Sequence, residues 1–101
     1  MISDKEQPLP RGELDDSSET RPGDMTDGEY RVGVTFNPSG NPAVDGVKVR
    51  TAMLIDDMLN IVASSKRGGM PSEAGRCAAL AATAFEEAAM WAVKALTKPA
   101  R

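Results

Sequence analysis

A short break at residues 66–71 divides the second half of the chain into two long helical patterns. The break reads Lys-Arg-Gly-Gly-Met-Pro, and two glycines followed by a proline end one helix and let the next begin. Because the link is so short, the two flanking helices must run antiparallel as a hairpin. The sequence therefore predicts an all-α protein, an antiparallel two-helix hairpin with one helix at about residues 42–64 and the other at about 72–97.

The first predicted helix has a clear start. Asn41 can accept a hydrogen bond from the first-turn amides, and Pro42 occupies the first helical position, where no backbone donor is missed. Apolar residues then recur along a broad face. They are Val44, Val47, Leu54, Ile55, Leu59, Ile61 and Val62.

The second predicted helix contains the stretch Thr83–Leu96, which is rich in strong helix formers. Apolar residues recur there at helical spacing, at Leu80, Ala84, Ala88, Trp91 and Ala95. Because alanine lets another backbone come close, we expect this helix to have neighbours on more than one side. In the predicted hairpin Trp91 lies opposite Gly46, and the pair Glu86-Glu87 lies level with Arg50, with which it can form an ion pair.

The N-terminal part differs from the rest in charge. Residues 1–30 carry nine acidic and three basic side chains, whereas residues 31–101 carry nine basic and six acidic ones. Since large apolar side chains are scarce before residue 30, we predict that residues 1–29 form a disordered acidic segment. Residues 30–101 are the predicted domain, with an extended arm at 30–40. Its basic excess favours an anionic partner, and an ordinary mixed-charge surface is the alternative.

The composition excludes the commonest catalytic and metal-binding chemistry. The chain has no histidine and only one cysteine, Cys77, so it lacks the usual general base and the ligands of a zinc site. Cys77 is predicted to be a buried structural thiol. Asp56-Asp57 and Glu86-Glu87 are adjacent pairs, and neighbours on a helix point about 100° apart, so neither pair faces one substrate. We therefore predict a protein that is not an enzyme and uses no metal or cofactor.

A two-helix hairpin of this size buries little apolar surface. Chains this small usually need disulfides, a metal or oligomerisation, and of these only self-association is open here. We therefore expect a homo-oligomer. The N-terminus has no apolar signal-peptide region, and the longest uncharged run of the second half, Cys77–Phe85, is too short to span a bilayer. These features predict an intracellular protein without a membrane partner.

The residues suited to ligand binding are aromatic, basic or polar. Aromatic rings stack on bases, and lysine or arginine pairs with phosphates. By these criteria the candidate ligand-binding residues are Tyr30, Phe36, Asn37, Ser39, Lys48, Arg50, Arg76 and Lys94. The alternative is that Phe36 belongs to the core and Lys48 to the plain surface.

Two blocks of the sequence resemble a known family. The first is Phe36-Asn-Pro-Ser-Gly-Asn-Pro-Ala-Val-Asp-Gly-Val-Lys48, and the second helix adds Arg76, Thr83 and Glu87-Ala-Ala-Met-Trp-Ala-Val-Lys94-Ala. Over about residues 30–98 the chain resembles the helical-hairpin sponges of bacteriophages, the anti-CBASS and anti-Thoeris proteins. The resemblance implies a homo-oligomer, typically a hexamer, in the host cytoplasm. It also implies that cyclic dinucleotides, and in some members cyclic trinucleotides, are sequestered without cleavage.

The resemblance further implies which residues contact the ligand. In the anti-CBASS branch an aromatic residue of the arm and a lysine early in the first helix do so. By position these are Tyr30, or failing that Phe36, and Lys48. Thr83, in the second-helix block, joins the candidates on the same ground. Two alternatives stay open, a small oligomeric nucleic-acid-binding regulator and a structural assembly without a ligand. The acidic N-terminal segment and the lack of a basic stripe on the second helix oppose DNA binding.

Overall fold

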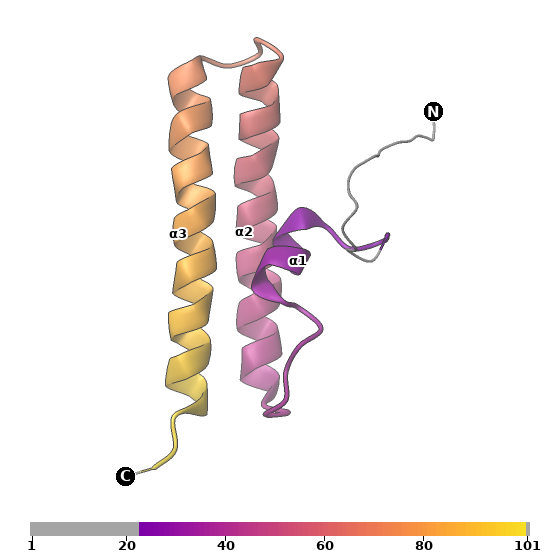
Figure 1. Ribbon diagram of the computed structural model, residues 1–101, viewed down its shortest axis with the longest axis vertical. Coiled ribbons are helices and arrows are strands. Elements are labelled where there is room, and N and C mark those ends of the chain that lie inside the picture. The colour runs from indigo at the N-terminus through magenta and orange to yellow at the C-terminus, as the bar shows by residue number, and fades with distance from the viewer. Residues whose placement is uncertain (1–22, 101) are drawn as a thin grey trace.

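The computed structural model of the chain describes residues 23–100, which form three helices and no strand (Figure 1). These helices are α1 at Asp27–Val32, α2 at Pro42–Lys66 and α3 at Ser72–Thr97. The two long helices lie side by side and antiparallel, and α1 lies against α2 and also touches α3. The predicted all-α hairpin is therefore confirmed. α3 has the predicted bounds, and α2 begins at the predicted residue and ends two residues later than predicted.

The short helix α1 corrects the prediction for the segment before the hairpin. Tyr30–Val32 are helical instead of extended, and Asp27–Glu29 are helical instead of disordered. The cause is a capping box, in which Thr26 Oγ1 accepts from the Glu29 N–H at 3.1 Å and Glu29 Oε1 accepts from the Thr26 N–H at 2.9 Å. The predicted disorder of residues 1–22 lies outside the described residues.

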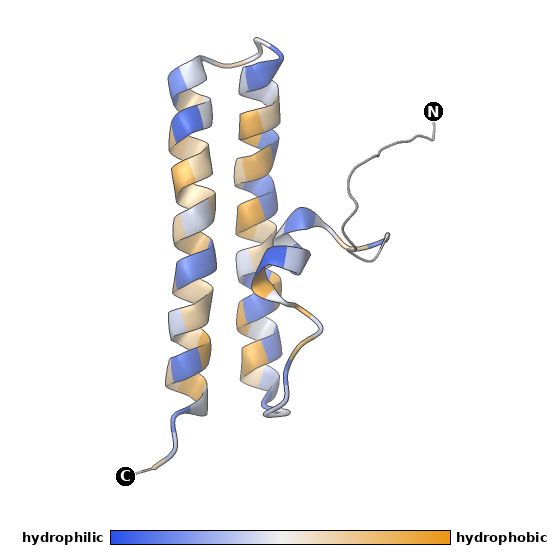
Figure 2. Cartoon of the chain, viewed as in Figure 1, coloured by the Kyte–Doolittle hydropathy of each residue, from blue (hydrophilic) through white to orange (hydrophobic). Residues whose placement is uncertain are grey.

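Small side chains form most of the contact between the long helices. Besides Lys48, the buried residues are Val44, Ala52 and Ile55 on α2 and Gly75, Ala78, Ala82 and Ala89 on α3. Hydrophobic residues recur along both long helices (Figure 2), and some of them, such as Met53 on α2 and Leu80 on α3, stay exposed. Trp91 is 61% exposed, and the three atoms nearest to a Cβ at Gly46 all belong to Arg50, so the predicted packing of Trp91 against Gly46 is wrong. The alanine face of α3 allows a closer approach to α2 than the face with the larger side chains, which stays on the surface.

Gly28 brings α1 into backbone contact with α2. This glycine is buried, and its N–H donates to Asp56 Oδ1 at 2.7 Å. A Cβ at this position would collide with the Ala52 carbonyl oxygen and would lie 2.8 Å from Asp56 Oδ1. Only glycine therefore permits α1 to lie this close to α2.

An ion pair joins α1 to α3. Arg31 Nε donates to Glu86 Oε1 at 3.0 Å, with both side chains partly exposed. Glu86 is thus paired with Arg31, and the pairing predicted with Arg50 is wrong. Cys77 is exposed, so the prediction of a buried thiol is also wrong. Among residues 23–100 no helix combines the length and apolarity needed to cross a membrane.

Candidate ligand-binding site

The loop between α1 and α2 is held by the side chain of Lys48. α1 ends at Val32 and is capped by Gly33, which adopts the left-handed conformation with φ 67° and ψ 54°. The Gly33 carbonyl oxygen accepts from the Phe36 N–H at 2.9 Å and from the Lys48 ammonium at 3.0 Å. The ammonium also donates to the carbonyl oxygen of Phe36. Lys48 lies in the second turn of α2, and its two hydrogen bonds therefore hold the backbone at the start of the loop in place.

The environment of the Lys48 ammonium favours an anion. Lys48 is only 7% exposed, and among the described residues no carboxylate forms an ion pair with it. An ammonium has three N–H donors, and the two loop carbonyls use two of them. A buried charge without an opposite charge is costly, so a bound anion would be stabilised at the remaining donor.

Phe36 lies beside this lysine and faces solvent. The Lys48 Nζ lies 5.5 Å from the centroid of the Phe36 ring, and Phe36 is 69% exposed. This cation–π contact between the ammonium and the ring favours the position of Phe36 beside Lys48. Phe36 is therefore not a core residue and Lys48 is not a plain surface residue, which removes the alternative considered for each.

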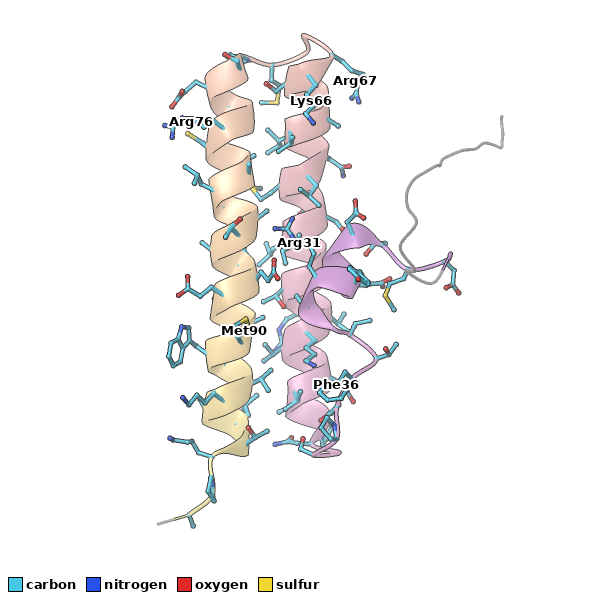
Figure 3. All side chains as sticks on the ribbon, viewed as in Figure 1. Arg31, Phe36, Lys66, Arg67, Arg76 and Met90 are labelled. Atoms are coloured by element: carbon cyan, nitrogen blue, oxygen red, sulfur yellow. The ribbon has the colours of Figure 1, made fainter. Side chains whose placement is uncertain are left out.

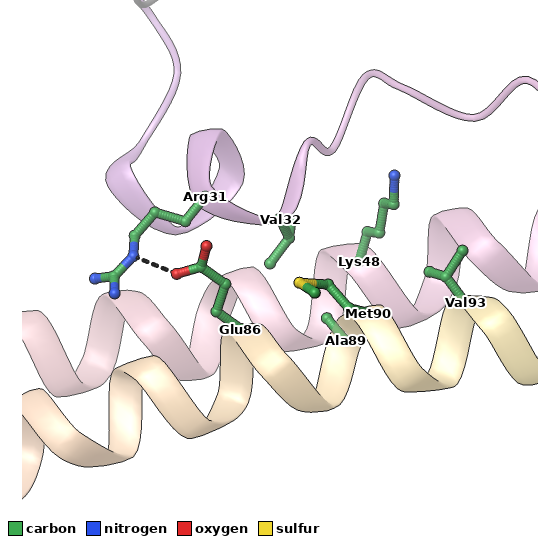
Figure 4. A pocket seen from close by; sticks show the side chains of 7 residues that line it. All are labelled: Arg31, Val32, Lys48, Glu86, Ala89, Met90 and Val93. Atoms are coloured by element: carbon green, nitrogen blue, oxygen red, sulfur yellow. Dashed lines mark hydrogen bonds and ion pairs between the residues drawn. The ribbon is translucent and has the colours of Figure 1, made fainter.

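Two surface depressions meet at Lys48. The loop depression has a volume of about 250 Å³ and is lined by Phe36, Asn37, Pro38, Ser39, Val44, Lys48, Val93 and Thr97. The α1 depression has a volume of about 200 Å³ and is lined by Arg31, Val32, Lys48, Glu86, Ala89, Met90 and Val93 (Figure 4). Pockets for small-molecule ligands usually measure about 300–1,000 Å³. Each depression alone is therefore smaller than a typical ligand pocket.

Asn37 and Ser39 direct their polar groups into the loop itself. Asn37 Nδ2 donates to the Asn41 carbonyl oxygen at 2.9 Å and to Asp45 Oδ1 at 3.0 Å. Ser39 Oγ donates to Asn37 Oδ1 at 2.6 Å and accepts from the Asn41 N–H at 3.1 Å. These bonds give both side chains a role in shaping the loop depression, since their main donors are already used.

The other end of the hairpin holds Arg76. Figure 3 places Arg76 near the turn between the long helices and Phe36 near the opposite end. Arg76 binds Glu73 through Nε and Nη2, at 3.1 Å and 2.5 Å, and this contact lowers the pKa of the Glu73 carboxyl. The structure therefore does not bring Arg76 to Lys48 within one protomer. Arg50 is exposed and lines neither depression.

Thr83 and Lys94 belong to what we call the outer face of α3. Its exposed residues are Leu80, Thr83, Ala84, Glu87, Ala88, Trp91, Lys94 and Ala95. Lys94 Nζ lies 5.2 Å from the Trp91 ring centroid, and the Thr83 hydroxyl donates to the Ala79 carbonyl oxygen at 3.3 Å. This face lines neither depression, so a contact of these two residues with the same ligand requires another protomer.

The α1 depression contains residues that sequence reasoning missed. Arg31, Val32, Glu86 and Met90 line it, whereas the predicted Tyr30 is half exposed and lines neither depression. The signal for α1 was present in Thr26-Asp-Gly-Glu29, which fits the capping-box pattern. With this helix predicted, Arg31 would belong to a helix packed against α2 and not to an extended arm.

The protein is a small all-α hairpin with a lysine between two surface depressions. Because no carboxylate among the described residues pairs with this lysine, the site suits an anionic ligand. The family model of the Acb2/Tad1 hairpin domain matches residues 28–97, which include most of α1 and all of α2 and α3. The chain belongs to this family, the anti-CBASS and anti-Thoeris sponges. The resemblance seen in the sequence is confirmed. No curated protein and no solved structure matches the chain significantly.

Proposed function

We propose that the protein binds cyclic oligonucleotide second messengers in the host cytoplasm and holds them without cleavage. The family is a family of sponges, which supports binding over catalysis. The observation that carries the proposal is the ammonium of the buried residue Lys48, which has one donor left, no carboxylate partner among the described residues and the exposed Phe36 ring beside it. A phosphate fits the ammonium, and a base fits the ring face.

Calorimetry against a panel of ligands tests this proposal. The panel consists of cyclic dinucleotides, cyclic trinucleotides, the matching linear dinucleotides and a DNA duplex. We expect at least one cyclic ligand to bind and the linear dinucleotides and DNA to bind much more weakly. Absence of binding to every cyclic ligand would reject the proposal, and preferential binding of the duplex would favour a nucleic-acid-binding regulator.

Alanine substitution of the two aromatic residues before α2 identifies the stacking ring. Phe36→Ala is expected to weaken cyclic dinucleotide binding about fivefold or more, because stacking of a base on an aromatic ring contributes about 1–3 kcal/mol. Tyr30→Ala is the matched control, since Tyr30 lines neither depression. A large effect of Tyr30→Ala with none of Phe36→Ala would move the site from the loop to α1.

The small volume of the two depressions and the exposed outer face of α3 both support an oligomer. We expect light scattering to give a mass above that of a dimer, as the sponge family suggests. Trp91→Glu should lower this mass, because it replaces the exposed aromatic ring of the face that we assign to protomer contact with a second carboxylate beside Glu87. Lys98→Glu, outside this face, is the control. A wild-type mass near 10.7 kDa at micromolar concentration would contradict assembly.

A further inference from the structure

The α1 depression contains a carboxylate, which the loop depression does not. The Glu86 side chain is 34% exposed, and its Oε1 accepts from Arg31 Nε at 3.0 Å. Its Oε2 makes no hydrogen bond or ion pair with the other described residues. Most of the remaining lining is apolar, from Val32, Ala89, Met90 and Val93. This depression therefore combines an available acceptor with apolar walls, as Figure 4 shows.

A carboxylate in the wall restricts what this depression can take from a cyclic dinucleotide. It repels a phosphate, whereas the Lys48 ammonium on the shared border attracts one. The apolar walls instead suit the faces of a base. The carboxylate suits a base edge that carries hydrogen-bond donors and no acceptor. An ionised carboxylate accepts hydrogen bonds and cannot donate them.

Purines differ at the edge that would meet Glu86. Guanine presents two neighbouring donors there, N1–H and the N2 amino group, and a carboxylate can accept both. Adenine presents one amino donor next to the N1 acceptor, whose lone pair the carboxylate repels. We propose that the α1 depression is a base subsite in which Glu86 selects guanine over adenine. This inference rests on the proposed function.

Arg31 acts as the positioning residue of this subsite. Its hydrogen bond to Oε1 orients the carboxylate and offsets part of its charge. Each carboxylate oxygen has two lone pairs, so Oε1 can accept from Arg31 and from a base at once. With the base in this depression, the attached phosphate can reach Lys48 on the shared border.

Calorimetry with cyclic di-GMP and cyclic di-AMP tests the subsite in wild type, Glu86→Gln and the control Asp57→Asn. Wild type should bind cyclic di-GMP at least about fivefold more tightly, since a bidentate pair contributes about 1–3 kcal/mol of discrimination. In Glu86→Gln the amide offers an acceptor and a donor, which matches adenine, so the ratio of dissociation constants should shift at least about fivefold toward cyclic di-AMP. Asp57 is exposed on α2 and outside both depressions, so Asp57→Asn should keep the wild-type ratio.

The outcomes separate this inference from the proposed function. Equal wild-type affinity for both ligands, a wild-type preference for cyclic di-AMP, or an unchanged ratio in a folded Glu86→Gln would overturn the guanine subsite while the sponge function stands. Far-UV circular dichroism establishes that the variant is folded. If wild type binds neither of these two ligands, the guanine subsite is rejected, and the proposed function then depends on the other cyclic ligands of the panel.

Discussion

Replacement of Lys48 by methionine is expected to lower the affinity for a cyclic dinucleotide about ten- to a hundredfold. The ammonium has one donor left after its bonds to the Gly33 and Phe36 carbonyl oxygens, and we assign that donor to a ligand phosphate. A charge-assisted hydrogen bond contributes about 1.5–3 kcal/mol, which gives this loss of affinity. Methionine keeps an unbranched side chain in the same space, so the helices should form as in wild type.

The control for this experiment is Lys66→Met, which removes a charge from an exposed residue in the last turn of the same helix. It should change neither affinity nor circular dichroism appreciably. Wild-type affinity of Lys48→Met for every cyclic ligand that the parent binds would show that the proposed phosphate contact is wrong. Loss of the helical signal in Lys48→Met would instead make Lys48 part of the scaffold, and the charge-retaining Lys48→Arg would then be expected to restore folding.

A second large effect is expected for Gly28→Ala. The added Cβ collides with the Ala52 carbonyl oxygen, so α1 must move away from α2. Overpacking of this kind costs about 1–3 kcal/mol, which for a small domain lowers the melting temperature by about 4 °C or more. Because α1 supplies Arg31 and Val32 to the α1 depression, the affinity for the cyclic ligand should fall as well.

Thermal unfolding and calorimetry measure the two effects together. Gly23→Ala is the matched control, since nothing lies within 4 Å of a Cβ at Gly23. It should leave both the melting temperature and the affinity unchanged. If Gly28→Ala melts at the wild-type temperature, α1 does not dock on α2 as the structure describes.

The hairpin could be predicted from sequence because its signals are local. The two glycines and the proline of residues 66–71 define the turn, and Asn41 caps α2 by accepting from the Ala43 N–H at 2.9 Å. α1 is different, because six residues form a stable helix only with tertiary support. Gly28 of α1 contacts Asp56 on α2, and Arg31 of α1 contacts Glu86 on α3. No pattern within α1 reveals partners so distant in the sequence.

The candidate site was predicted only in part. Lys48 Nζ lies 5.5 Å from the centroid of the Phe36 ring, and the contact of either residue with a ligand stays a prediction. Composition identifies side chains able to bind a nucleotide, but it does not show that Asn37 and Ser39 already satisfy each other in the loop. Composition also could not decide which face of α3 packs against α2, the face of small residues that includes Ala78 and Ala82 or the face that carries Leu80 and Trp91. That choice places Thr83, Trp91 and Lys94 on the outer face of α3.

Recovery of the bound ligand tests most directly whether the protein sequesters its ligand intact. The protein is incubated with a cyclic dinucleotide that it binds, the free ligand is measured after ultrafiltration, and the retained fraction is denatured and chromatographed. We predict that free ligand falls in proportion to the protein added and that all retained ligand is recovered as the intact cyclic form, with Lys48→Met depleting much less. Linear product that accumulates with time and protein concentration, or free ligand that does not fall, would contradict the sponge function.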